Sequence, residues 1–360
     1  MSTPSRQGLA PLQLEYQQLL AQATQCATQR VRVHETGFSS AVVNTDALGL
    51  RYSHFNGRRF SVAERDNTAR INLLVGGSVA MGIGASSDEY TVASQLSALT
   101  GELWLSLAGC GLDASQELLM FLTHEHRLAP LGHVVILSGL NSLAHEALWD
   151  ISACSHEPRQ INDWQTSLAG SEQAQAASEP SLSLWQRLSQ MLAPPAAAPR
   201  PRRPFEALSP AEKRTAQAAD HIARSVQQWD RLLGSAHTTL TFILQPLVHW
   251  CRETLPAGEQ FMLSALQQTP GNIDRLLEGV FDRKVHAAFF RRIREQAAPV
   301  PCFDMNCMLD SSPAFGSDLF IDRLHLNDMG QTALANVITA KLGLAREKPL
   351  SASTLQCSTD

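Results

Sequence analysis

The chain of 360 residues has no long uninterrupted apolar run and no excess of basic charge. No stretch approaches the roughly 18 consecutive apolar residues of a membrane-spanning helix. The formal net charge of −5 leaves no basic footprint for nucleic-acid binding. The first residues lack a basic segment followed by an apolar one, so they do not resemble a signal peptide. We therefore expect a cytoplasmic protein with no membrane span and no nucleic-acid partner.

Paired cysteines are also missing. The seven cysteines are scattered, and no two of them form a C-x-x-C pair. In a long chain without a signal peptide, such cysteines are expected to be free thiols. The histidine-rich segment THEHR, residues 123–127, suggests a metal site, but no partner ligands follow at the spacing of a zinc site. We interpret this segment as the polar end of a helix.

Five short runs rich in β-branched or aliphatic residues predict buried strands. They are residues 70–76, 103–108, 133–139, 239–245 and 300–305. Because helical patterns separate these apolar runs, they indicate a parallel sheet with helices on both faces. The fold class we expect is α/β: a flavodoxin-like three-layer α/β/α domain with about five parallel strands.

Composition divides the chain into three parts. Residues 1–69 predict a helix and an arm that pack on the core, residues 70–345 form the α/β domain, and residues 346–360 are a tail. An insertion at about 142–207 separates the third predicted strand from the fourth. Within it, about 169–204 is rich in Ala, Ser, Gln and Pro, a composition typical of a flexible linker.

Helix-end signals mark two helices in the second half of the chain. Ser209, Pro210 and Glu212 predict a capping box with proline at the first helical position, and Gly234 marks the end of that helix. A second helix is expected to begin near Asn327 and to end at a glycine sixteen residues later.

A serine stands where the first predicted strand gives way to a glycine-rich turn. Ser78 follows two glycines in VGGSVAMG. This position lies at the carboxyl edge of a parallel sheet, where active sites collect, and a helix beginning there offers free N–H groups. A serine nucleophile needs a base, and the base needs an orienting carboxylate. Asp322 and His325, three residues apart in DRLHLNDMG, supply both groups.

Two further segments follow predicted strands. Gly111 lies in SLAGCGLDAS after the second strand, and Asn141 lies in SGLNSL after the third. A backbone N–H and a side-chain amide at these places, together with the N–H of Ser78, would stabilise the oxyanion of an acyl-transfer intermediate. The candidate groups thus follow strand ends in the order Ser, Gly, Asn, Asp/His.

These segments, in this order, resemble the sequence blocks of the SGNH hydrolase superfamily, also called GDSL esterases and lipases. GGSVAMG is similar to block I, SLAGCG to block II, GLN to block III and DRLHLNDMG to block V. The resemblance implies that Ser78 is the nucleophile, that Gly111 and Asn141 are oxyanion donors, that His325 is the base and that Asp322 orients it.

The resemblance covers about residues 70–342 without the insertion, and it has departures. Gly77 stands where the family's aspartate precedes the serine, Ser106 replaces the usual asparagine of block II, and Ser142 replaces the aspartate after Asn141. None of these changes removes a catalytic atom. The segment GGSVA also nearly fits the nucleophile elbow of α/β-hydrolases, but that serine normally follows several strands, and its acid and base lie on separate loops.

The resemblance implies a serine hydrolase that cleaves a carboxylic ester or thioester through an acyl-enzyme, with no metal or organic cofactor. The first alternative is an acyltransferase that passes the acyl group to an alcohol, an amine or a carrier-bound acceptor. The second is a non-catalytic binding protein on the same fold. The expected partner is a small-molecule or carrier-bound acyl substrate, and the oligomeric state stays open.

Overall fold

The computed structural model describes residues 14–16, 18–20, 34–65, 69–128, 130–152, 210–234, 237–268, 277 and 279–344. Within the N-terminal segment expected to be helical, residues 14–16 and 18–20 are in a helix. The predicted linker at about 169–204 and the tail at 346–360 lie outside these residues. The division into domains therefore stays a prediction.

The core of the fold is a parallel sheet of five strands in the order β4-β3-β5-β6-β7. The strands are β3 (Ile71–Gly76), β4 (Trp104–Ala108), β5 (Leu131–Ser138), β6 (Thr239–Leu244) and β7 (Cys302–Asp304). All five predicted strands are confirmed, although β5 begins two residues earlier than expected and β7 is shorter. Along the chain this order reads 2-1-3-4-5, the flavodoxin-like order, so the predicted fold class is confirmed.

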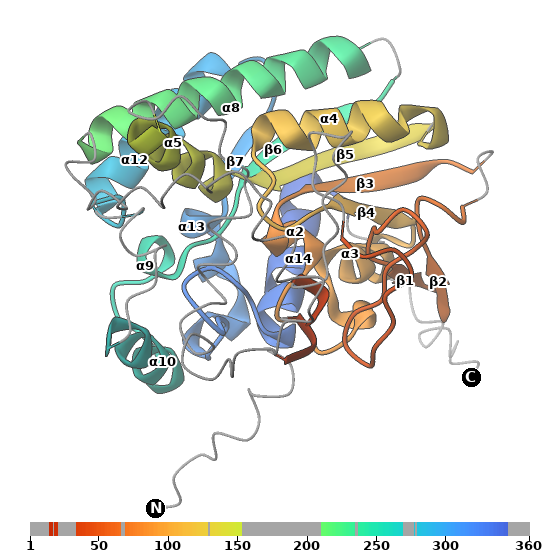
Figure 1. The fold of residues 1–360 in the computed structure, drawn as a ribbon, viewed down its shortest axis with the longest axis horizontal. Coiled ribbons are helices and arrows are strands. Elements are labelled where there is room, and N and C mark those ends of the chain that lie inside the picture. Colours follow the sequence, from red (N-terminus) through yellow and green to blue (C-terminus); the bar gives the residue numbers. More distant parts are fainter. Residues whose placement is uncertain are drawn as a thin grey trace, which may run out of the picture.

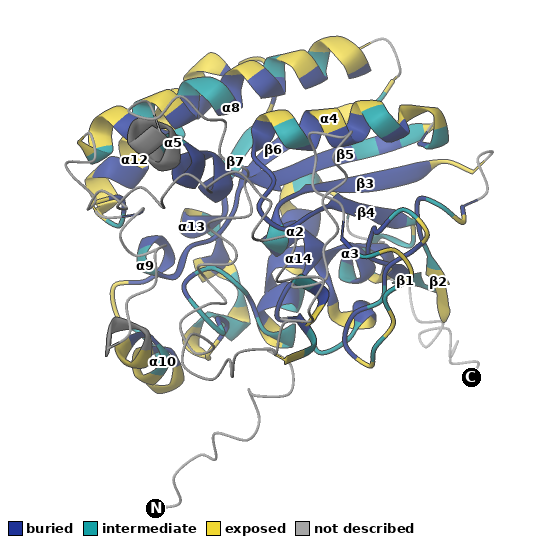
Figure 2. Ribbon diagram, in the orientation of Figure 1, coloured by how far each residue is buried: buried dark blue, intermediate teal, exposed yellow. Residues whose placement is uncertain are grey.

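Helices cover both faces of the sheet (Figure 1). One face carries α4 (Ala114–His124), α5 (Leu140–Ser152), α8 (Ala211–Leu233) and α12 (Arg283–Gln296). The other carries α3 (Val92–Thr100) and α14 (Asp328–Leu342). Because side chains alternate along a strand, Leu73 and Val75 pack toward the first layer, while Leu74 packs toward the second. The strands of the sheet are buried almost throughout (Figure 2).

The remaining elements, all short except α10, lie mostly around the carboxyl edge of the sheet and beside α3. They are β1 (Ser53–Phe55), β2 (Arg58–Phe60), α2 (Ser78–Met81), η2 (Asp88–Tyr90), η3 (Glu125–Arg127), α9 (Val248–Cys251), α10 (Ala257–Gln268), α13 (Met305–Met308), η4 (Leu309–Ser311) and η5 (Pro313–Gly316). Strands β1 and β2 form an antiparallel hairpin. The N–H of His54 in this hairpin donates to the Ser94 hydroxyl on α3 at 2.8 Å, which attaches the arm to the core.

The helix-end predictions have mixed outcomes. Helix α14 begins as expected, because the Asn327 side chain caps it by accepting from the Gly330 N–H at 2.9 Å. The end of α8 at Gly234 is also confirmed. Its start differs from the prediction: Pro210 is the N-cap residue itself, without a side-chain cap, and Ser209 lies outside the described residues. A proline has no side-chain acceptor, so nothing at position 210 completes a capping box.

Two other predictions concern the helices of the first layer. The segment at 123–127 is the polar end of α4, which runs to His124 and continues as the short helix η3. The insertion expected at about 142–207 starts inside the core, since its first residues, 142–152, belong to α5. Residues 153–209 are not described.

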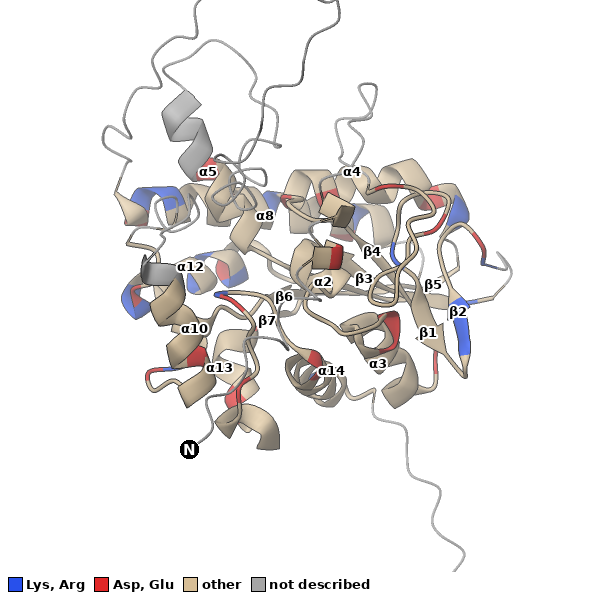
Figure 3. Cartoon of the chain, turned by 60° about the horizontal axis from the view of Figure 1, so that its bottom comes forward, with Lys and Arg blue, Asp and Glu red and all other residues tan. Residues whose placement is uncertain are grey.

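No helix in the described ranges is long and apolar enough to cross a membrane. Figure 3 shows that basic residues lie on the outer helix α12 and on strand β2, at opposite sides of the molecule in that view.

Candidate active site

Ser78 lies at the carboxyl edge of the sheet, directly after β3. Helix α2 begins at Ser78, with Gly77 as its N-cap. As the first helical residue, Ser78 has an N–H with no acceptor inside the helix, so this group is free to bind a ligand. The absence of a side chain at Gly77 leaves room for Asn141, because a Cβ atom there would lie 2.3 Å from Nδ2 of Asn141. Gly77 thus lets the Asn141 amide approach the serine turn.

The structure brings Ser78, His325 and Asp322 together. The Ser78 Oγ lies 2.7 Å from Nε2 of His325, and Nδ1 of the same ring lies 2.6 Å from Oδ2 of Asp322. The first pair joins residues 247 positions apart in the chain. The His325 side chain is 16% exposed and that of Asp322 34%, so both side chains are largely shielded from solvent.

The loop before α14 holds this arrangement through its own backbone. The Oδ1 atom of Asp322 accepts from the N–H groups of Leu324 and His325, at 2.8 and 2.7 Å. The Ile321 N–H donates to the carbonyl of His325 at 2.9 Å. One carboxylate therefore closes the turn with one oxygen and orients the imidazole with the other.

The charge of Asp322 sets the roles of the two ring nitrogens. Burial raises the pKa of this carboxyl, but the His325 imidazole and the N–H donors of His325 and Leu324 outweigh burial, so the pKa lies below its ordinary value. An ionised carboxylate only accepts hydrogen bonds. Nδ1 of His325 therefore donates to Asp322, and Nε2 is left to accept the proton of the Ser78 hydroxyl.

The two predicted oxyanion donors also come to this place. Asn141 is buried at the start of α5, and its Nδ2 donates to the Leu112 carbonyl at 2.8 Å. The amide has a second N–H, and Nδ2 lies against the backbone of Gly77. Gly111 precedes Leu112 in the turn after β4, with a positive φ of 77° that favours glycine. The turns carrying Ser78 and Gly111 thus meet at the Asn141 side chain.

A buried pair that the sequence patterns did not predict lies beside these donors. Asp113 lies two residues after Gly111, and His145 lies four residues after Asn141, on the same face of α5. The Asp113 Oδ2 and His145 Nδ1 atoms are 2.7 Å apart, and the side chains are 12% and 9% exposed. The available signal was the helical spacing of Asn141 and His145, since residues four apart lie on one face of a helix.

The N-terminal arm also has a role that its sequence pattern did not indicate. Arg51 of the arm is fully buried. Its guanidinium donates to the Gly82 carbonyl at 2.8 Å and to the Met81 carbonyl at 3.3 Å, at the end of helix α2. Asp88 balances its charge at 2.7 Å. The arm therefore anchors the carboxyl end of the short helix that carries Ser78, where a cation is favoured.

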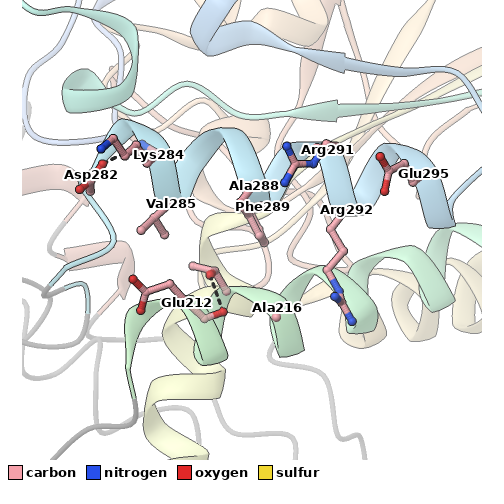
Figure 4. A pocket seen from close by; sticks show the side chains of 11 residues that line it. Glu212, Ala216, Asp282, Lys284, Val285, Ala288, Phe289, Arg291, Arg292 and Glu295 are labelled. Carbon is pink, nitrogen blue, oxygen red and sulfur yellow. Dashed lines mark hydrogen bonds between the residues drawn. The ribbon is translucent and has the colours of Figure 1, made fainter.

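One cavity of the described surface belongs to another part of the fold. It measures about 350 Å³ and lies between α8 and α12, with Glu212, Val285, Phe289 and Arg292 among its lining residues (Figure 4). None of the candidate catalytic residues lines it. Among the described residues, no group of three or more His, Cys, Asp or Glu side chains is placed to hold a metal ion.

No protein-family model matches the chain, and no curated protein matches it in sequence. Solved structures with similar folds include an acetyl xylan esterase, 11% identical, with a TM-score of 0.39, covering 76% of this chain and 100% of its own. A putative arylesterase from Agrobacterium tumefaciens is 14% identical, with a TM-score of 0.36, covering 77% of this chain and 100% of its own. A GDSL-like lipase from Bacteroides thetaiotaomicron is 10% identical, with a TM-score of 0.34, covering 78% and 93%.

Proposed function

We propose that this protein is a serine hydrolase that cleaves a carboxylic ester or thioester through an acyl-enzyme. The observation that carries the proposal is the continuous chain of contacts from Ser78 through His325 to Asp322, at 2.7 and 2.6 Å. A nucleophile, a base and an orienting carboxylate within hydrogen-bond reach are the recognised signature of this chemistry.

In the first half-reaction, the Ser78 Oγ attacks the acyl carbonyl while Nε2 of His325 takes the hydroxyl proton. The carbonyl π bond opens, and the oxyanion is held by the N–H groups of Ser78 and Gly111 and by the Asn141 amide. The C–O or C–S bond to the leaving group then breaks. His325 gives its proton to that group, and Asp322 stabilises the imidazolium in between.

In the second half-reaction, water attacks the acyl-Ser78 ester with His325 again as the base. The acid is released, and the Ser78 hydroxyl regains its proton. If an alcohol, an amine or a carrier-bound acceptor took the place of water, the same acyl-enzyme would perform acyl transfer. Product analysis with and without added acceptors separates these two outcomes.

The test is the Ser78→Ala variant, assayed with a fluorophosphonate probe and with p-nitrophenyl esters and acyl thioesters of increasing chain length. Labelling should disappear, and turnover should fall by several orders of magnitude, as on loss of a triad serine elsewhere. A matched control is Ser115→Ala, because the exposed Ser115 hydroxyl also contacts a histidine, Nε2 of His221 at 2.6 Å. That variant should keep full labelling. Retention of more than about a tenth of the activity in Ser78→Ala would contradict the proposal.

A further inference from the structure

The segment that carries the Gly111 N–H is attached to helix α5 at three consecutive points. The Asn141 amide donates to the Leu112 carbonyl at 2.8 Å. The Ala114 N–H donates to the Ser142 hydroxyl at 3.2 Å. Between these contacts, Asp113 meets a histidine on the next turn of the same helix, with Oδ2 2.7 Å from Nδ1 of His145.

We infer that Asp113 and His145 form a positioning pair, which holds the Gly111 turn in register with Asn141 so that both oxyanion donors face one point. This inference rests on the proposed function, since it concerns the oxyanion hole of the same reaction. The pair contacts no substrate in this assignment and acts through the segment between Gly111 and α4.

The two oxygens of Asp113 have separate tasks. Oδ1 accepts from the Gln116 N–H at 2.9 Å and so caps α4, while Oδ2 faces His145. The Gln116 side chain returns a hydrogen bond to the Asp113 N–H at 3.0 Å and completes a capping box. Loss of His145 therefore leaves the helix cap in place and releases only the link to α5.

The charge state makes this link directional. Burial raises the pKa of Asp113, but the hydrogen bond and charge of His145, together with the Gln116 N–H, outweigh burial and keep the pKa below its ordinary value. A carboxylate can only accept, so Nδ1 of His145 donates. The other ring nitrogen, Nε2, is buried and has no partner among the described residues. The ring is thus held at one end, by Asp113.

A small shift of the Gly111 turn would be costly for the reaction. A misplacement of about 1 Å lowers a rate by up to roughly 10²-fold, and loss of one oxyanion donor costs about 10²–10³-fold. Gly111 is joined to Asp113 through a single residue, Leu112. The position of its N–H therefore depends on where Asp113 is held.

The rate of Ser78 phosphonylation by a fluorophosphonate tests the inference without knowledge of the natural substrate. In this reaction the Ser78 Oγ–P bond forms, the P–F bond breaks, fluoride leaves, His325 takes the hydroxyl proton, and the phosphoryl oxygen enters the oxyanion hole. His145→Leu should lower the maximal rate constant about 10–100-fold, with the dissociation constant of the probe nearly unchanged. His145→Asn keeps a donor near the Nδ1 position and should restore the rate to within about threefold of the wild type.

A second variant removes the charge while keeping the helix cap. Asp113→Asn retains an oxygen for the Gln116 N–H, since asparagine is a good N-cap, but its amide can bond to His145 only in the other ring tautomer and without the charge-assisted hydrogen bond. It should slow phosphonylation as His145→Leu does, and it remains informative if the leucine variant does not fold.

The matched control is another buried histidine–aspartate pair among the described residues, His286 and Asp304. Its Nε2–Oδ2 distance is 2.9 Å, and its side chains are 6% and 7% exposed. It joins α12 to β7 and has no direct contact with Ser78, Gly111, Asn141 or His325 among the described contacts. His286→Leu should lower thermal stability and leave the phosphonylation rate within about threefold of the wild type.

The outcomes separate the inference from the proposed function. Wild-type rates in folded His145→Leu and Asp113→Asn would overturn the positioning role while leaving Ser78 as the nucleophile. An equal loss in His286→Leu would assign the effect to general destabilisation and would also overturn it. If the wild-type protein is not labelled at Ser78 at all, the proposed function fails, and the inference fails with it.

Discussion

At the scale of single residues, the presence or absence of individual atoms decides which groups of the candidate site come into contact. Gly77 has no side chain, and for that reason the Asn141 amide lies against the backbone before Ser78. Asp322 has two oxygens, and each is used: one closes its own turn and the other holds His325. Substitutions that keep the shape but change one atom are therefore the informative ones.

Changing Asp322 to asparagine should reduce kcat by up to roughly 10⁴-fold, because an amide no longer selects the ring tautomer that accepts the Ser78 proton. The pKa of Asp322 lies below its ordinary value, so this residue stays ionised across the acid limb of the rate profile. The value of kcat/KM should rise with pH along its acid limb, because a protonated base cannot accept the Ser78 proton. The measurement is a pH–rate profile of the wild type beside Asp322→Asn and His325→Ala. A flat wild-type profile, or normal turnover by His325→Ala, would place the base elsewhere.

At the scale of elements, helix α10 stabilises the loop that carries Asp322 by accepting hydrogen bonds from its backbone. Glu259 on this helix is fully buried, and one of its oxygens accepts from the N–H groups of Leu319 and Phe320, at 2.7 and 3.1 Å. Its other oxygen accepts from Arg252 at 2.8 Å, and Arg252 also donates to the Ser317 carbonyl. The loop of Asp322 and His325 thus depends on a buried ion pair that contacts neither Ser78 nor His325.

Glu259→Ala should destabilise the protein by about 3–5 kcal/mol, because it leaves the Arg252 charge buried without its carboxylate. It should also lower kcat/KM, since two N–H groups of the loop before Asp322 lose their acceptor. Chemical denaturation and steady-state kinetics measure the two effects. The control is Glu253→Ala, which breaks an exposed ion pair with Arg283. The Arg283 side chain is 46% exposed and that of Glu253 is 77% exposed. An exposed pair contributes about 0–1 kcal/mol, so comparable losses in both variants would contradict the role given to Glu259.

At the scale of the whole molecule, the strand order brings distant segments to one place. Strand β3 lies between β4 and β5. After β3 the chain passes to the face of α3, and after the neighbouring strand β4 it passes to the opposite face, which carries α4. This reversal of strand order is where α/β sheets bind their ligands. The turns after all three strands meet there, with Ser78, Gly111 and Asn141.

The same packing buries a carboxyl group, Glu117 on α4, with consequences for global stability. Burial raises its pKa to about 8 from 4.5; a hydrogen bond from the Ser138 hydroxyl opposes the rise, and the Asp113 charge adds to it. Between these two values the folded chain holds a proton that the unfolded chain has released. The free energy of unfolding therefore falls as the pH rises through this window, by up to a few kcal/mol, on the order of 1.4 kcal/mol per pH unit.

Glu117→Gln keeps the oxygen that accepts from Ser138 at 2.5 Å and removes the titration. Its stability relative to the wild type should therefore increase from pH 5 to pH 9, as measured by urea denaturation at each pH. Glu125→Gln, on the exposed turn after α4, should show no such trend. A difference between Glu117→Gln and the wild type that stays constant with pH would contradict the buried, protonated state of Glu117.

Local patterns determined much of this fold and of the candidate site. Continuous apolar runs predict buried parallel strands because both of their faces must avoid water, and the run ending at Gly76 also placed Ser78 at a strand end. Asp322 and His325 were visible for a similar reason, since groups three residues apart in one turn meet without help from the rest of the chain. The start of α14 at Asn327 followed from a cap that needs only its own first turn.

The contacts between elements were decided only in the tertiary structure. Asp113 caps α4 while His145 lies on α5, Arg51 reaches the end of α2 from the arm, and Glu259 supports a loop sixty residues later. A hydrophobic period indicates which face of a helix is buried, but it does not specify which residues of another element that face will meet. Such pairings depend on the order of the strands and on the packing of whole layers, because a buried charge persists only where another element supplies its partner.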